Sequence, residues 1–145
     1  MHVRQLFPEL QIPASGLAAE KLRMEVVANN IASAHSAGST PETTFRRQHV
    51  VFADQQAQHY RGTAGTQGLH GVAVLGVIPD QSDLQQVYEP GHPQADPQGF
   101  VSYPNVSIPI EMIDLMTASR AYEANLKALQ LQTRMAEQSL SLLRG

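Results

Sequence analysis

Apolar and small side chains in the last third of the chain recur at alternating steps of three and four residues. The positions are Met112, Leu115, Ser119, Tyr122, Leu126, Leu129, Thr133, Ala136, Leu140 and Leu143. This heptad spacing places them on one stripe of a helix, which we predict over Pro109–Leu143. Such a stripe needs a cover, either a helix of the same chain or one of a neighbouring subunit. The alternative is a single amphipathic helix packed on its own globular core.

A second helical pattern lies near the start of the chain and predicts a helix over Pro13–Ala34, because proline suits a first helical turn. Its apolar face consists of Leu10, Ala14, Leu17, Met24, Ala28 and Ile31, and Lys21 interrupts it. Asn29 and Asn30 lower the helix propensity near its end. Two interpretations of this pair remain open: local hydrogen bonds in the last helical turn, or pairing with a neighbouring subunit.

The middle of the chain predicts short strands separated by turns. Val72–Ile78 is the strongest strand signal, because it is rich in β-branched residues and ends at a proline. Phe45–Ala53 and Phe100–Tyr103 are further candidates, and Leu84–Glu89 is the expected hairpin partner of Val72–Ile78. Between them, Gln55–Gly71 is poor in apolar residues and predicts a flexible loop.

Together these elements predict an α+β fold. The N- and C-terminal helices are expected to pair as a coiled-coil-like α-hairpin, with a small β-rich insert between them. We divide the chain into an N-terminal helical segment (1–44), the insert (45–104, with the flexible loop near 55–71) and the C-terminal heptad helix (105–145). A length of 145 residues suits one modest domain, or a small domain with a helical stalk.

Residues with the potential for catalysis or metal binding show no organised pattern. The six histidines have no ligand spacing such as HExxH or HxH. His92 and Asp96 lie close together on the proline-rich segment 90–105, but neither a second carboxylate nor a nucleophile accompanies them. We therefore expect no catalytic residue, no cofactor and no metal, and we do not expect an enzyme.

Composition excludes further classes of protein. The chain has no cysteine, which excludes disulfides and thiolate chemistry, and its formal net charge of −3 gives no argument for nucleic-acid binding. No apolar run is long enough for a membrane span. Met1–Leu10 lacks the apolar core of a cleaved secretory signal. A route out of the cytoplasm would thus be one that does not cleave such a signal.

Several segments, taken in order, are similar to one known family. Arg23–Ala34 (RMEVVANNIASA), with Ser15 and Leu17 before it, resembles the ANNIAN-type signature of the bacterial flagellar rod and hook family. Further segments resemble the proximal, C-type rod members of that family: Thr40-Pro41, Phe45–Phe52, Tyr88–Pro93, Gly99–Val101, Pro104–Val106 and Ala118–Asn125. The loop Gln55–Gly71 has no match, and Ser33 stands where the signature has a further Asn.

The resemblance implies a structural subunit of the flagellar basal-body rod, the drive shaft that crosses the periplasm and transmits torque. Its expected partners are copies of itself, other rod proteins and the flagellar type III export apparatus, which exports such subunits without signal cleavage. The expected assembly interface adds Leu17, Met24, Asn29, Asn30 and Ile31 to the ten heptad positions of the last helix. The rival hypotheses are a cytoplasmic helical adaptor or chaperone of a secretion system, and a small enzyme that uses the proline-rich segment.

Overall fold

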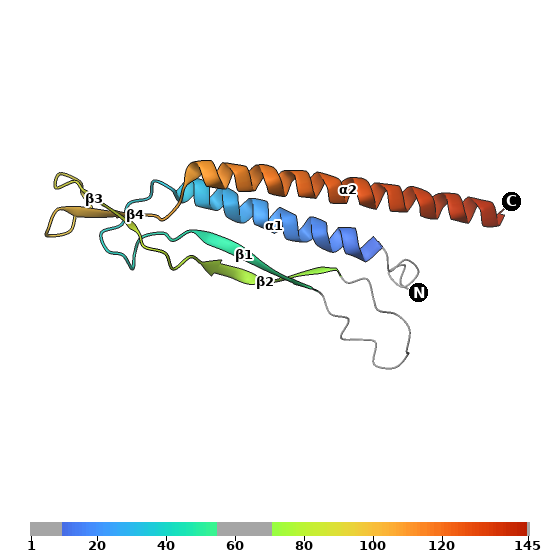
Figure 1. Ribbon diagram of the computed structural model, residues 1–145, viewed down its shortest axis with the longest axis horizontal. Helices are drawn as coiled ribbons and strands as arrows, with labels where there is room; N and C mark the ends of the chain where they lie inside the picture. Colours follow the sequence, from blue (N-terminus) through green and yellow to red (C-terminus); the bar gives the residue numbers. More distant parts are fainter. Residues whose placement is uncertain (1–9, 55–70, 145) are drawn as a thin grey trace, which may run out of the picture.

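Two antiparallel helices of unequal length lie side by side and form the long axis of the molecule (Figure 1). The computed structural model describes residues 10–54 and 71–144, with side chains described as far as residue 142. Helix α1 spans Gln11–Ser33 and helix α2 spans Ile108–Arg144. The predicted α+β fold with paired terminal helices is confirmed, and both predicted helices deviate from the observed bounds by at most two residues. The division at residues 44 and 104 stays a prediction.

Small side chains let the two helices approach each other closely. Pro13, Gly16 and Ala19 are buried on α1. A Cβ atom added at Gly16 would lie 2.8 Å from Nδ2 of Asn125 on α2, so a side chain at position 16 would require Asn125 to move. The α1–α2 interface is therefore narrow at this level.

A two-stranded antiparallel sheet packs against α1, on the side away from α2 (Figure 1). Strand β1 spans Gln48–Asp54 and strand β2 spans Val72–Pro79. The register shifts between Val51 and Phe52, which leaves Leu75 without a partner in the pairing and with 70% of its surface exposed. Both strands were predicted, although β1 begins at Gln48 and not at Phe45. The loop predicted over Gln55–Gly71 lies outside the described residues except for Gly71.

A second antiparallel pair projects beyond the end of the helical hairpin (Figure 1). It consists of β3 (Gln85–Tyr88) and β4 (Phe100–Tyr103). The prediction that 84–89 would pair with β2 is therefore wrong. The reason is the turn at Asp80, whose side chain accepts the Ser82 N–H at 2.8 Å and whose backbone N–H is bonded to the Arg47 carbonyl at 2.7 Å. This turn holds the end of β2 next to residue 47 and directs the chain away from the first sheet.

The described core is small and contains charge. Its buried apolar side chains are mostly short, among them Ala19, Val26, Val27 and Ala118, and the fully buried set includes Asn30 and Glu111. Their burial requires hydrogen-bond partners, because an unpaired buried polar group costs free energy of folding. Within the described ranges, neither helix is apolar enough over a sufficient length to cross a membrane.

Candidate functional site

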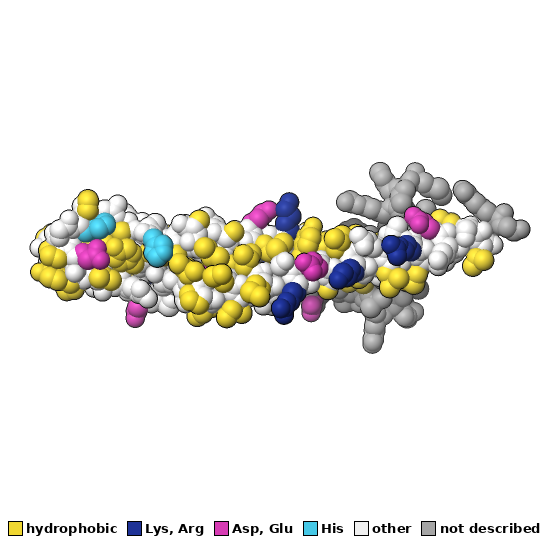
Figure 2. All heavy atoms as spheres, turned by 90° about the horizontal axis from the view of Figure 1, so that it is seen from above, with side chains coloured by type: hydrophobic (Ala, Val, Ile, Leu, Met, Phe, Trp, Pro, Cys, Tyr) yellow, Lys and Arg dark blue, Asp and Glu magenta, His cyan; other side chains and the backbone are white. Residues whose placement is uncertain are grey.

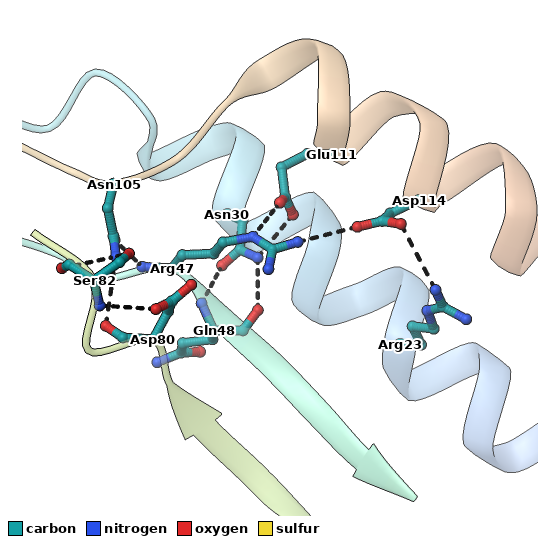
Figure 3. Close-up of polar contacts among 9 residues, drawn as sticks. All are labelled: Arg23, Asn30, Arg47, Gln48, Asp80, Ser82, Asn105, Glu111 and Asp114. Atoms are coloured by element: carbon teal, nitrogen blue, oxygen red, sulfur yellow. Dashed lines mark hydrogen bonds and ion pairs between the residues drawn. The ribbon is translucent and has the colours of Figure 1, made fainter.

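The end of α1, the start of β1 and the first turns of α2 meet in a cluster that we call the polar junction (Figure 3). It consists of Asn30, Arg47, Gln48, Glu111 and Asp114. Asn30 and Glu111 have 0% of their surface exposed. Since these residues come from three elements that are distant in sequence, the junction is where the fold fixes the helices and the insert to one another.

Asn30 is the centre of the polar junction. Its Nδ2 donates to the Gln48 carbonyl and to Oε2 of Glu111, both at 2.8 Å, and its Oδ1 accepts the Gln48 N–H at 2.9 Å. The amide thus substitutes for a strand neighbour at the first residue of β1. Both hypotheses for the asparagine pair need correction at Asn30, whose partners are neither in its own helical turn nor in another subunit. Asn29 is exposed.

Arg47 neutralises the acids of the junction. Its Nε contacts Oε1 of Glu111 at 2.6 Å, and a terminal nitrogen contacts Oδ2 of Asp114 at 3.0 Å. The hydrogen bond to Glu111, followed by the charges of both acids, raises the pKa of the Arg47 guanidinium. Arg23 of α1 reaches the other oxygen of Asp114 at 3.7 Å. The buried carboxylate of Glu111 therefore lies beside the permanently positive guanidinium of Arg47. A buried charge needs such a partner of opposite sign.

Asn105 ties the junction to the turn after β2. Its Oδ1 accepts the Arg47 N–H at 2.8 Å, and its Nδ2 donates to Oγ of Ser82 at 2.7 Å. In the same turn, the hydrogen bond from the Ser82 backbone N–H is the main cause that lowers the pKa of Asp80. The acids and bases of this region are thus engaged with one another and with the backbone. Such an arrangement can hold elements rigidly, which is the property of a structural joint.

His92 and Asp96 shape the loop between β3 and β4. Nδ1 of His92 accepts the Gln94 N–H at 3.1 Å. Oδ1 of Asp96 accepts the N–H groups of Gln98 and Phe100, both at 2.8 Å. Gly99 has a φ of +85°, a conformation that glycine adopts without steric cost. Both side chains therefore stabilise turns. Among the described residues, no three acids or histidines come together as ligands for a metal, and His2, His59 and His70 lie outside those residues.

The α1 residues of the predicted assembly interface are distributed over several faces. Leu17, Met24 and Ile31 are half-buried, while Asn30 is buried in the polar junction and Asn29 is exposed. The apolar face that we predicted for this helix is wrong in part, because Ala14 and Ala28 are exposed. The observed buried face begins at Pro13 and continues through Val26 and Val27. Sequence pattern missed it because its members include glycine and asparagine, which do not count as apolar.

The α2 residues of the predicted interface divide into two groups. Most of the buried or half-buried positions of α2 follow a heptad of their own: Glu111, Leu115, Ala118, Tyr122, Asn125, Leu129, Gln132 and Ala136. Four of our predicted positions belong to it: Leu115, Tyr122, Leu129 and Ala136. Ser119 is half-buried beside it, whereas Met112, Leu126, Thr133 and Leu140 are exposed, and the side chain of Leu143 lies outside the described residues. At every second predicted position from Met112 to Thr133, the residue on the covered face is thus the one that comes directly before the predicted residue.

A further side of α2 carries apolar residues that the first pattern did not include. Leu131, Met135 and Leu142 have 59%, 50% and 83% of their surfaces exposed, and we call them the outer stripe. Their spacing of four and seven residues puts them on one helical face. Figure 2 looks onto the side of the molecule that α2 forms and shows apolar side chains there, with Lys and Arg among them. A search for a second period in the same helix would have found this stripe.

Comparisons with known proteins agree on one family. Residues 98–142 match the family model described as the C-terminal part of flagellar basal body rod FlgEFG proteins. The flagellar basal-body rod protein FlgC of Borreliella burgdorferi is 34% identical, with 97% of this chain and 99% of the relative covered. The FlgC proteins of Salmonella typhimurium and Bacillus subtilis are 38% and 30% identical, over 90% and 94% of this chain and 92% and 97% of their own lengths. The chain therefore belongs to the FlgC family of flagellar basal-body rod proteins.

Proposed function

We propose that this protein is a structural subunit of the flagellar basal-body rod, where its terminal helices pack against those of other subunits. Membership of the FlgC family supports a location in the rod and assembly with other rod components. It also supports a structural role and not an enzymatic one.

The observation that carries the proposal is the distribution of apolar residues around α2. One face of the helix is covered by α1, while Met112, Leu126 and Leu140 and the outer stripe are exposed to solvent. A helix that is apolar on several sides is normally buried on several sides. The single chain covers only one of these sides. Assembly with further subunits would supply the missing cover, and the interface would include most of the predicted positions.

The finer part of the proposal concerns the route and the place. The subunit would be exported by the flagellar type III apparatus without signal cleavage and would form part of the shaft that crosses the periplasm. Copies of the same chain would be among its neighbours. The unbroken N-terminal helix of the rod-type signature and the absence of cysteine from the chain are compatible with passage between compartments.

Purification of basal bodies from the native organism tests the proposal. We expect the protein to co-purify with them, and peptide mass spectrometry to recover a peptide from the first ten residues. Recovery only in the cytoplasmic fraction would contradict the proposal and favour the adaptor or chaperone hypothesis. Recovery in basal bodies with a shortened N-terminus would contradict only the export route.

A further inference from the structure

A long groove lies along α1, between the outer edge of β1 and α2. It is formed by two adjoining hollows of about 500 Å³ and 440 Å³, and Phe52 lines both. One hollow extends from Arg47 past Val26, and the other extends from Gly16 to Asp54. Apolar side chains and a helix surface line a space of this size as they would line a site for another helix.

The outer stripe has the chemistry of an occupant for this groove. Its exposed Leu131, Met135 and Leu142 offer an apolar ridge to the apolar lining.

Charge also favours contact between the end of α2 and the groove. The groove is lined by four acids and two bases: Glu20, Asp54, Asp80, Asp114, Arg23 and Arg47. The part of α2 from Leu126 to Leu142 carries two bases and one acid: Lys127, Arg134 and Glu137. Within the described residues, no base forms an ion pair with Asp54, which is exposed at the mouth of the groove.

The α2 end of the same molecule cannot reach the groove. Asn125 already lies at its far end, beside Gly16. The helix then continues straight past the start of α1 (Figure 1). At 1.5 Å per residue, Leu142 lies roughly 25 Å further along the axis. The occupant must therefore be another molecule.

We propose that the outer stripe of one copy packs into the α1–β1 groove of the next copy, with Arg134 paired to Asp54. The inference rests on the proposed function. Different surfaces meet in this contact, and such a heterologous contact propagates into an open array instead of closing a dimer. The part of α2 beyond Asn125, which extends past the start of α1, thus links successive subunits along the shaft.

Cysteine cross-linking in isolated basal bodies tests the contact, since the native chain has no cysteine. Chains with Asp54→Cys are co-expressed with chains that carry Leu131→Cys, Met135→Cys or Leu142→Cys, so that a mixed disulfide joins two copies. We expect a dimer on non-reducing gels for at least one of these pairs. The matched control is Glu137→Cys, which is exposed on the same part of α2 but lies away from the outer stripe, and it should give no dimer.

Charge reversal provides an independent test that needs no cysteine. Asp54→Arg and Arg134→Glu should each lower the amount of protein in basal bodies about two- to fivefold, as expected for loss of one exposed ion pair at a repeated contact. The combined variant should restore it. Rods that contain the cysteine variants without any cross-link, or a combined variant as impaired as the single ones, would overturn the inference. Absence of the unaltered protein from basal bodies would instead contradict the proposed function.

Discussion

Asn29 and Asn30 are adjacent in the sequence, but the fold uses them in different ways. Asn30 is fully buried and makes three hydrogen bonds that join α1 to β1 and α2, whereas Asn29 faces solvent. An amide is suited to the buried position because it donates to a carbonyl and accepts from an N–H of the same strand residue. A carboxylate there would lose the donor and would face Glu111.

Substitution of the buried asparagine should therefore be far more costly than substitution of its neighbour. Asn30→Ala leaves both backbone groups of Gln48 and one oxygen of Glu111 without this partner, and we expect a loss of about 2–3 kcal/mol in the free energy of unfolding. Urea denaturation of the purified monomer measures it. Asn29→Ala is the matched control and should change stability by less than about 0.5 kcal/mol. Equal effects of the two substitutions would contradict the role assigned to Asn30.

The ion pair between Arg47 and Glu111 makes a different prediction, because both partners can be removed. Arg47→Met leaves the buried Glu111 without its base and should destabilise the monomer by about 3 kcal/mol. Arg47→Met combined with Glu111→Met removes the stranded charge as well, so it should recover much of that loss. The cycle is measured by urea unfolding at neutral pH. A combined variant less stable than Arg47→Met alone would show that Glu111 contributes mainly through Asn30.

Sequence alone could not identify the polar junction. The pattern singled out Asn30 because an asparagine pair is unusual in a helix, but its partner Glu111 is 81 positions away. In the sequence, Glu111 is only an acid in the first turn of a helix, where the helix dipole favours negative charge. Its burial depends on where Arg47 arrives after the turn at residues 34–44, and no local pattern encodes that position.

At the scale of single elements, α2 shows what periodicity can and cannot predict. The extent of the helix was predicted to within one residue at each end, because a heptad persists over its whole length. The covered face was displaced at alternate positions, because Glu111, Ala118, Asn125 and Gln132 are buried or half-buried, whereas Met112, Leu126 and Thr133 beside them are exposed. Close contact with the small residues of α1 accounts for this preference. The partner of β3 was mispredicted for a related reason, since tertiary contacts at Asp80 determine where the strand goes.

Close packing at Gly16 predicts sensitivity to side-chain size in α1. Gly16→Leu would place its side chain against Asn125 and separate the helices, and we expect a loss of about 1–3 kcal/mol in the free energy of unfolding. Ala18→Leu, an exposed position in the same helix, should be nearly neutral in urea unfolding. Asn125→Ala should partly rescue Gly16→Leu, because it removes the atoms that a side chain at position 16 meets. If Asn125→Ala gave no rescue, contact with Asn125 would not be the cause of the destabilisation by Gly16→Leu.

At the scale of the whole molecule, the fold is an elongated helical hairpin, with the β1–β2 sheet on one side of α1 and α2 on the other (Figure 1). The order of elements could be predicted because each has a clear local signal. The arrangement leaves more apolar surface exposed on α2 than a single chain covers. A shaft needs many contacts between subunits and no turnover, and such a surface serves that need.

Leu126 allows the need for assembly to be separated from the need for folding. Its side chain is 38% exposed in the single chain, so Leu126→Asp should lower the free energy of unfolding of the monomer only modestly, by about 1 kcal/mol. In the rod, the new carboxylate would have to be buried without a partner, which disfavours packing with a neighbouring subunit. We expect this variant to abolish swimming in soft agar and to be missing from purified basal bodies, while still being exported.

Gln130→Asp, one helical turn further along, is the control and should support swimming, because position 130 is polar in the native chain. Normal swimming of Leu126→Asp would show that this side of α2 is not covered in the rod. A much larger loss of monomer stability would instead show that Leu126 acts mainly within the single chain.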